Sequence, residues 1–196
     1  MKRASLGVSV LLLVSVLSQS SAAQAERPSP GAQRLRNALT DLRRDPNDPT
    51  LQERYIEAFP QDYKSFLELF EPDRELYDGH EYINVLPRLA MTHERQVGKL
   101  LVALGQDAHY EADAPGYLRQ ALATYGSQHT KAFAGLIGSM PVRKQNQLIT
   151  FLADVENPAA YPEYQGIIDH LKALGDGGLA RTFEKARERR AKQPHQ

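Results

Sequence analysis

Apolar residues recur along most of the chain with the period of an α-helix. In successive segments they occupy positions i, i+3, i+4 and i+7, which places them on one face of a helix. The matching sets lie at residues 35–42, 63–70, 97–104, 118–125, 133–140, 148–155 and 164–171. No segment alternates apolar and polar residues with β-branched enrichment, so the pattern predicts no strands. The sequence therefore predicts an all-α fold.

Residues that begin and end helices divide this pattern into short elements. Asp48 precedes Pro49, which places a capping acid before a proline at the first helical position. Pro87 lies inside the periodic pattern and predicts a kink or a helix end there. We expect about eight or nine short helices, packed as a compact irregular bundle or as a short α-solenoid-like stack. They form a single domain over residues 32–192, followed by a disordered tail at residues 193–196.

The start of the chain predicts export. Two basic residues precede an apolar run at residues 6–17, which has the length of the central part of a signal peptide and is too short to span a bilayer comfortably. Small polar residues follow, and an A-x-A motif ends at Ala25. We predict a cleavable signal peptide over residues 1–25, a flexible leader over residues 26–31, and a periplasmic or secreted mature protein.

Composition restricts the function of the mature domain. The chain has 24 basic and 24 acidic residues, and the predicted signal peptide carries two of the basic ones and no acid. A near-neutral domain has no electrostatic basis for binding nucleic acid. No segment after the signal peptide is apolar enough to span a membrane. The chain has no cysteine, which excludes disulfides, thiol chemistry and lipid attachment through a cysteine.

The densest group of polar side chains alternates with other residues in a short segment. It consists of Asp107, His109, Glu111 and Asp113. Alternate oxygen and imidazole groups can converge on one metal ion. However, the segment lacks the central glycine and the distal glutamate of an EF-hand. A loop between helices that ends in an Asp113 cap explains the acids without any ion, so we favour that interpretation and assign no metal ligands.

No other motif identifies a catalytic site. The pairs His80-Glu81 and His93-Glu94 both lack the second histidine of the H-E-x-x-H zinc motif. The chain also lacks a G-x-S-x-G nucleophile motif, a P-loop and a dinucleotide-binding glycine pattern. We therefore assign no catalytic residue and no cofactor.

Aromatic residues are concentrated between residues 55 and 82. The phenylalanines among them are spaced for the core of a helical domain. Tyrosine buries a large area while keeping a polar tip, so tyrosines beside a short loop are candidates for a binding surface. We combine these tyrosines with the polar segment described above as a hypothetical partner-binding set. Its members are Tyr77, His80, Tyr82, Asp107, His109 and Glu111.

The stretch over residues 58–83 reads AFPQDYKSFLELFEPDRELYDGHEYI, with aromatic residues at recurring helical positions. With the later segment at residues 105–113, it resembles a loosely defined group of small all-helical bacterial proteins. Some members of that group are thought to act as immunity partners of antibacterial toxins. The resemblance covers about half of the mature chain and consists mostly of aromatic core spacing. It implies a helical, protein-binding domain and supplies no catalytic residues.

Three functions fit these observations. The first is an exported, non-enzymatic protein-binding domain, most concretely a periplasmic immunity protein that inhibits a secreted antibacterial toxin. Such a domain would bury an interface of standard size, with tyrosines as anchors. The second is a metal-dependent hydrolase that uses the loop at residues 107–113. The third is a structural adaptor of the cell envelope.

Overall fold

The computed structural model of the protein describes residues 29–77, 79–109, 113–155 and 161–192. These residues form helices and loops, with no strand among them, which confirms the predicted all-α fold. The predicted signal peptide and the predicted tail lie outside the described residues. The helices are α1 (Pro30–Arg44), α2 (Pro49–Ala58), α3 (Tyr63–Phe70), α4 (His80–Gly105), α5 (Asp113–Gln128), α6 (Thr130–Gly138), α7 (Val142–Ala153), α8 (Pro162–Ala173) and α9 (Gly177–Ala191).

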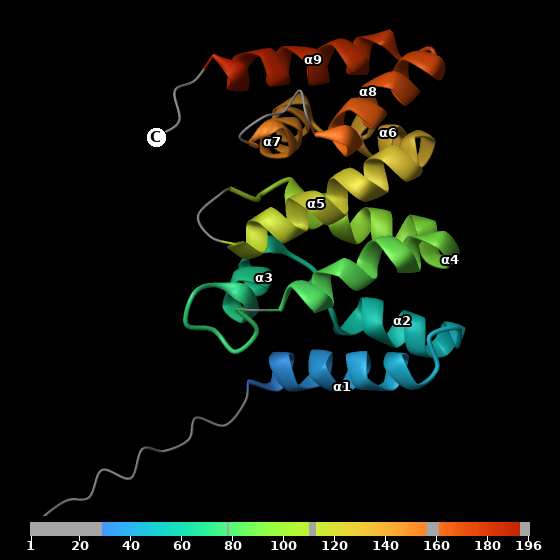
Figure 1. The fold of residues 1–196 in the computed structure, drawn as a ribbon, viewed down its shortest axis with the longest axis vertical. Helices are drawn as coiled ribbons and strands as arrows, with labels where there is room; N and C mark the ends of the chain where they lie inside the picture. Colours follow the sequence, from blue (N-terminus) through green and yellow to red (C-terminus); the bar gives the residue numbers. More distant parts are fainter. Residues whose placement is uncertain (1–28, 78, 110–112, 156–160, 193–196) are drawn as a thin grey trace, which may run out of the picture.

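The helices are stacked in layers along the longest axis of the molecule, broadly in chain order (Figure 1). Helix α1 lies at one end and packs on α2, which in turn contacts α4. Helix α5 packs along α4 in the middle of the stack, and α8 and α9 follow toward the other end. This layered arrangement is a compact packing of helices, as expected from the sequence.

Local sequence signals account for the starts of the first helices. Asp48 accepts hydrogen bonds from the backbone N–H groups of Thr50 and Leu51, and Pro49 begins α2, as predicted. The side chain of Ser29 caps α1 in the same way, and Pro30 is its first residue. Helix α1 thus includes residues 30 and 31, which we had placed in the leader, because a capping serine followed by proline is itself a helix start.

The kink in α4 lies at His93 and not at Pro87, so the position predicted from the proline is wrong. Pro87 is inside the helix, whereas His93 has the non-helical backbone angles φ −122° and ψ 42°. There the helix meets α2, where the buried amide oxygen of Gln52 is 2.9 Å from both the Thr92 hydroxyl and His93 Nε2. These contacts hold the bend against α2.

One continuous apolar core runs through the stack from α1 to α9. The predicted core role of the phenylalanines is confirmed, since Phe59, Phe66 and Phe70 are almost completely buried and pack on one another. None of the helices that the structure describes is long and apolar enough to cross a membrane.

Helices α4 and α5 approach each other closely at two glycines of α4. A Cβ atom at Gly98 would lie 2.0 Å from the Tyr125 hydroxyl, and one at Gly105 would lie 2.6 Å from a methyl group of Leu122. The Tyr125 hydroxyl is buried and has no hydrogen-bond partner among the described residues. Burial, with a smaller contribution from the Glu94 carboxylate, raises the pKa of Tyr125 to about 12. The short distance between α4 and α5 depends on the absence of side chains at Gly98 and Gly105.

This close approach predicts opposite effects for two helical glycines. We expect Gly98→Ala to lower the free energy of unfolding by about 1–3 kcal/mol, because the new methyl group overlaps the ring of Tyr125. Gly135→Ala in α6 is the control, since a Cβ there meets no atom within 4 Å. Its expected effect is a gain of about 0.5–1 kcal/mol from the better helix propensity of alanine. Urea unfolding followed by circular dichroism measures both, and equal effects would refute the packing argument.

Candidate functional site

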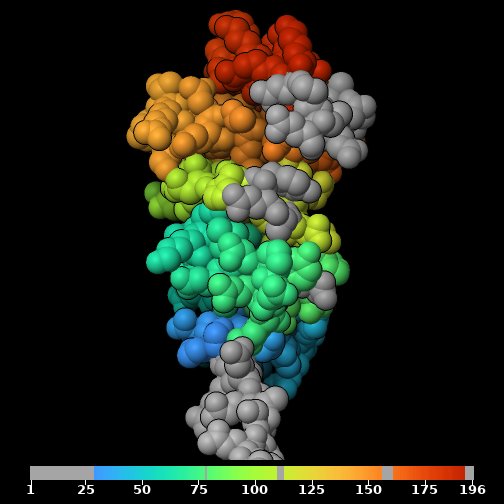
Figure 2. All heavy atoms as spheres, turned by 90° about the vertical axis from the view of Figure 1, so that its left-hand side faces the viewer, coloured from blue at the N-terminus to red at the C-terminus, as the bar shows by residue number. Residues whose placement is uncertain are grey.

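The proposed binding residues come from three segments that gather on one side of the molecule. These segments are the connection after α3, the start of α4, and the residues between α4 and α5. Figure 2 looks onto this side, where α7 lies above them and α9 lies at the top. Five of the six residues belong to the described part of the chain, and Glu111 lies outside it.

Two contacts join the connection before α4 and the first residue of α4 to the start of α5. The Tyr77 hydroxyl donates a hydrogen bond of 3.0 Å to Oδ2 of Asp113, the first residue of α5. One helical turn later, the ring of Tyr117 lies 5.4 Å from the imidazole of His80, measured between centroids. Tyr117 is 37% exposed, so the group presents aromatic surface to solvent. We call Tyr77, His80, Asp113 and Tyr117 the tyrosine patch.

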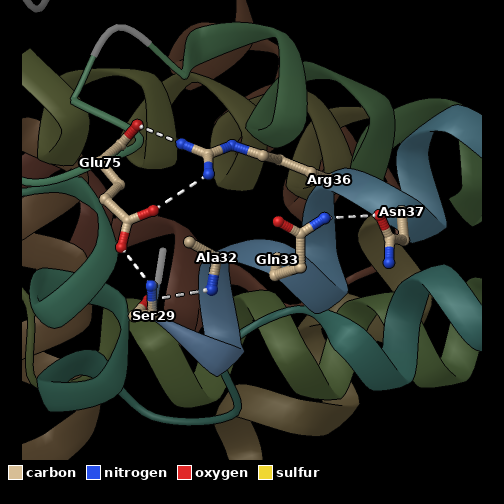
Figure 3. Close-up of polar contacts among 6 residues, drawn as sticks. All are labelled: Ser29, Ala32, Gln33, Arg36, Asn37 and Glu75. Carbon is tan, nitrogen blue, oxygen red and sulfur yellow. Dashed lines mark hydrogen bonds and ion pairs between the residues drawn. The ribbon is translucent and has the colours of Figure 1, made fainter. Parts of the chain in front are cut away.

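The connection that carries Tyr77 has little regular structure and is held by side-chain contacts with α1 (Figure 3). The Ser29 backbone N–H donates to the Glu75 carboxylate, and the Arg36 guanidinium donates to Glu75 Oε2 and to its backbone carbonyl, each at 3.0 Å. The Ser29 N–H and, to a smaller extent, Arg36 hold the pKa of Glu75 below its usual value. The adjacent Leu76 is buried in the core, which fixes the segment from its inner side.

Tyr82 faces the interior more than the tyrosine patch. Its side chain is half-buried, and its ring packs edge-on against Phe70 at 6.4 Å between centroids. Its backbone carbonyl accepts a hydrogen bond of 2.6 Å from the Tyr55 hydroxyl. Burial raises the pKa of Tyr55 well above its usual value, so that hydroxyl remains a donor. Tyr82 therefore belongs to the packing beneath the start of α4 and not to the exposed tyrosine patch.

Asp107 and His109 lie beside α7. Asp107 forms an ion pair with Lys144 of α7. The ring of His109 packs on Tyr63 at 5.2 Å, and its backbone carbonyl accepts a hydrogen bond of 2.8 Å from the Tyr63 hydroxyl. Both contacts position His109 at the edge of a groove of about 790 Å³, which we call the α7 groove. The described residues that line it are Ala108, His109, Val142, Arg143, Asn146, Gln147, Thr150, Phe151 and Asp154.

The α7 groove combines apolar and polar side chains. Val142 is 70% exposed at the first position of α7, although it is apolar. Phe151 lies at the inner side, and the Arg119 guanidinium sits 5.9 Å from its ring centroid. Asp154, directly after the last residue of α7, also lines the groove and forms a 2.7 Å ion pair with Arg190 of α9. Exposed apolar surface with a polar border is typical of a protein-binding surface.

Two acids of the loop at residues 107–113, for which we favour a loop without a metal ion, are engaged in other contacts. Asp107 pairs with Lys144, and Asp113 accepts the hydrogen bond from Tyr77. Within the described residues, no three His, Cys, Asp or Glu side chains are grouped so as to hold a metal ion.

A separate cleft of about 640 Å³ lies between α1 and the first half of α4. Its floor is formed by apolar residues that are almost fully buried, among them Leu39, Leu42 and Leu89. His80 lies on its border, and Met91, 73% exposed, lies near its other end. His80 thus connects this cleft with the tyrosine patch.

Sequence reasoning missed two residues of this face, Tyr117 and Val142. Both lie off the apolar stripe of their helix, which in α5 includes Leu118, Leu122 and Tyr125. A large apolar or aromatic residue outside the core stripe is expected to face solvent, so this signal was present in the sequence. Only the fold brings these residues to the same side as Tyr77 and His109.

Comparison of the chain with protein-family models, with curated protein sequences and with solved structures finds no match.

The Glu75 contacts predict a pH-dependent anchor for the tyrosine patch. Because the folded state lowers the pKa of Glu75, its contribution to stability is present above the usual glutamate pKa and is lost as the pH falls through the lowered value. We expect Glu75→Gln to lower the urea midpoint at pH 7, with a gap to wild type that closes as the pH is lowered toward 3. Glu68→Gln is the control, since Glu68 is exposed on α3 and forms no ion pair with the described residues. A gap that stays constant with pH would contradict this role.

Proposed function

We propose that the chain is an exported protein-binding domain, most concretely a periplasmic immunity protein that neutralises a secreted antibacterial toxin. One observation carries the binding role. Segments far apart in the sequence meet at the tyrosine patch, on the side of the molecule that also bears the α7 groove. This arrangement brings exposed aromatic and apolar side chains together with charged groups on a rigid helical stack.

The chemistry of this face supports a macromolecular partner. Tyr117 and Val142 expose apolar surface that a partner would cover, and tyrosine adds a polar tip that can form a hydrogen bond after burial. Ion pairs such as Asp107–Lys144 lie at the border, where they exclude water and set orientation. A stack whose layers share one core changes little on binding, so an inhibitor of this kind loses little conformational entropy.

The compartment is the second part of the proposal and rests on the sequence. The predicted signal peptide directs the domain to the space where toxins that attack the cell wall or the membrane act. A structural adaptor of the envelope would use the same face and would differ in having a constitutive partner.

The export proposal predicts a specific mature N-terminus. After expression in a Gram-negative host, we expect the periplasmic fraction to contain a chain that begins at Glu26, as measured by mass spectrometry of the intact protein. Ala25→Arg should block processing, because cleavage requires small residues at the two alanines of the A-x-A motif. Gln24→Arg between them is the matched control and should still be processed. A full-length precursor in the cytoplasm would contradict the proposal.

The binding proposal predicts recovery of a protein partner. We expect the mature chain to co-purify with a secreted effector encoded by a neighbouring gene and to inhibit that effector. Val142→Asp should weaken the complex by roughly tenfold or more, because it places an unpaired charge in a buried apolar contact. Leu174→Asp is the matched control, since Leu174 is 52% exposed beyond α8, away from the α7 groove.

Two results would count against binding at this face. One is that no protein is recovered even when the neighbouring gene products are supplied. The other is that both aspartate variants weaken a recovered complex equally while circular dichroism shows both to be folded. Surface plasmon resonance with the purified effector measures the affinity of each aspartate variant.

A further inference from the structure

A second groove lies beside the α7 groove, at the end of the stack. This second groove has a volume of about 450 Å³ and lies between α7 and α9, and we call it the α9 groove. Asn146 of α7 lines both grooves, so the two adjoin at this residue, and we call them together the depression. The described residues that line the α9 groove are Asn146, Thr182, Lys185, Glu188, Arg189 and Lys192.

Positive charge is concentrated in this depression. Lys185 and Arg189 are one helical turn apart on the same face of α9, and Lys192 follows them. Arg143 adds a fourth basic group from α7. All four basic residues are exposed, and none of them forms an ion pair with another described residue. Glu188 is the one acid among the described residues that line the α9 groove.

Three other charged residues of α9 contact neighbouring elements. Glu184 forms a 2.7 Å ion pair with Lys172 of α8, and Arg190 forms one of 2.7 Å with Asp154. Arg187 donates a hydrogen bond to Gln165. These contacts dock α9 on the stack, whereas the basic groups in the groove remain available to an external anion.

The spacing of the basic residues along α9 favours an extended polypeptide. Lys185 and Lys192 are separated by seven residues along a helix, which corresponds to about 10 Å. An extended chain covers that length with about three residues. Along the α7 groove, Asn146, Gln147 and Thr150 offer uncharged hydrogen-bonding groups, which suit the backbone of such a segment.

We infer that the α9 groove, together with Arg143, binds an acidic segment of a partner polypeptide. This inference rests on the proposed protein-binding function and names the chemistry of the partner. Carboxylates of the segment pair with Lys185, Arg189 and Lys192, while the adjoining chain lies along α7. The acidic stretch around α3, with seven acids against two basic residues between Asp62 and Glu81, offers the same segment no attractive contact.

A labelled peptide of ten glutamates tests the inference without a natural partner. Fluorescence anisotropy with the folded mature chain should show binding at low ionic strength that weakens steeply as salt is added. The double variant Lys185→Glu/Arg189→Glu should bind at least roughly tenfold more weakly, because two attractive contacts become repulsive. The matched control is Arg34→Glu/Arg54→Glu, which changes the net charge equally in a groove at the opposite end of the stack.

Three results would overturn the inference. The first is absence of peptide binding, and the second is an equal loss in both double variants, which would indicate a bulk charge effect. The third is binding of phosphatidylglycerol vesicles, or self-association of the chain in sedimentation, in place of peptide binding. Circular dichroism verifies that both double variants are folded.

The peptide assay separates this inference from the proposed function. If a partner co-purifies and its affinity is unchanged by Lys185→Glu/Arg189→Glu, the acidic-segment inference is wrong and the binding proposal stands. If the peptide binds selectively and no natural partner is found, the specificity of the groove stands and the immunity proposal fails.

Discussion

The close packing of α4 against α5 is the contact on which the rest of the structure depends. Helix α4 is the longest element described, and it touches layers on both sides of the stack. Gly98 and Gly105 allow α5 to approach so closely that the Tyr125 ring and Leu122 occupy the space of the missing side chains. Dispersion contacts at this distance stabilise both helices, and any added carbon atom must move one of them. The position of α5 then determines where its first turn emerges.

The binding face follows from that position. Asp113 and Tyr117 are in the first turns of α5, and they meet Tyr77 and His80 only because α5 lies along α4. The contact of Glu75 with Ser29 and Arg36 connects the same face to the start of α1. Ser29 lies four residues after the predicted cleavage site, so removal of the signal peptide would leave this contact intact. The face is therefore assembled from the connection after α3 and from the starts of α1, α4 and α5.

Sequence periodicity predicted the class of fold and much of its core, because each helix buries one apolar stripe. Phe66 and Leu118, for example, are completely buried as their spacing requires. The position of the kink in α4 escaped prediction, since the contact made there by Thr92 is with Gln52, forty residues away in the sequence. The same limit applies to the site. Tyr77 and His109 were identified from local features, but their partners Asp113 and Tyr63 are long-range neighbours. Periodicity reports which face of a helix is buried and carries no information about which helix covers it.

The zero net charge of the chain conceals an uneven distribution of charge. Seven acids and two basic residues fall between Asp62 and Glu81, whereas α9 carries five basic residues and two acids. In the stack these regions belong to different layers, with α9 at one end and α3 nearer the other (Figure 1). At physiological ionic strength charges are screened over about 8 Å, so a partner experiences each region separately and the cancelling total has little effect. The net charge of the whole domain therefore does not describe the α9 groove. The acidic segment of the proposed partner would orient it at the α9 groove, and its apolar neighbouring surface would hold it at the α7 groove. The stack provides both on one side because its layers display α7 and α9 next to each other.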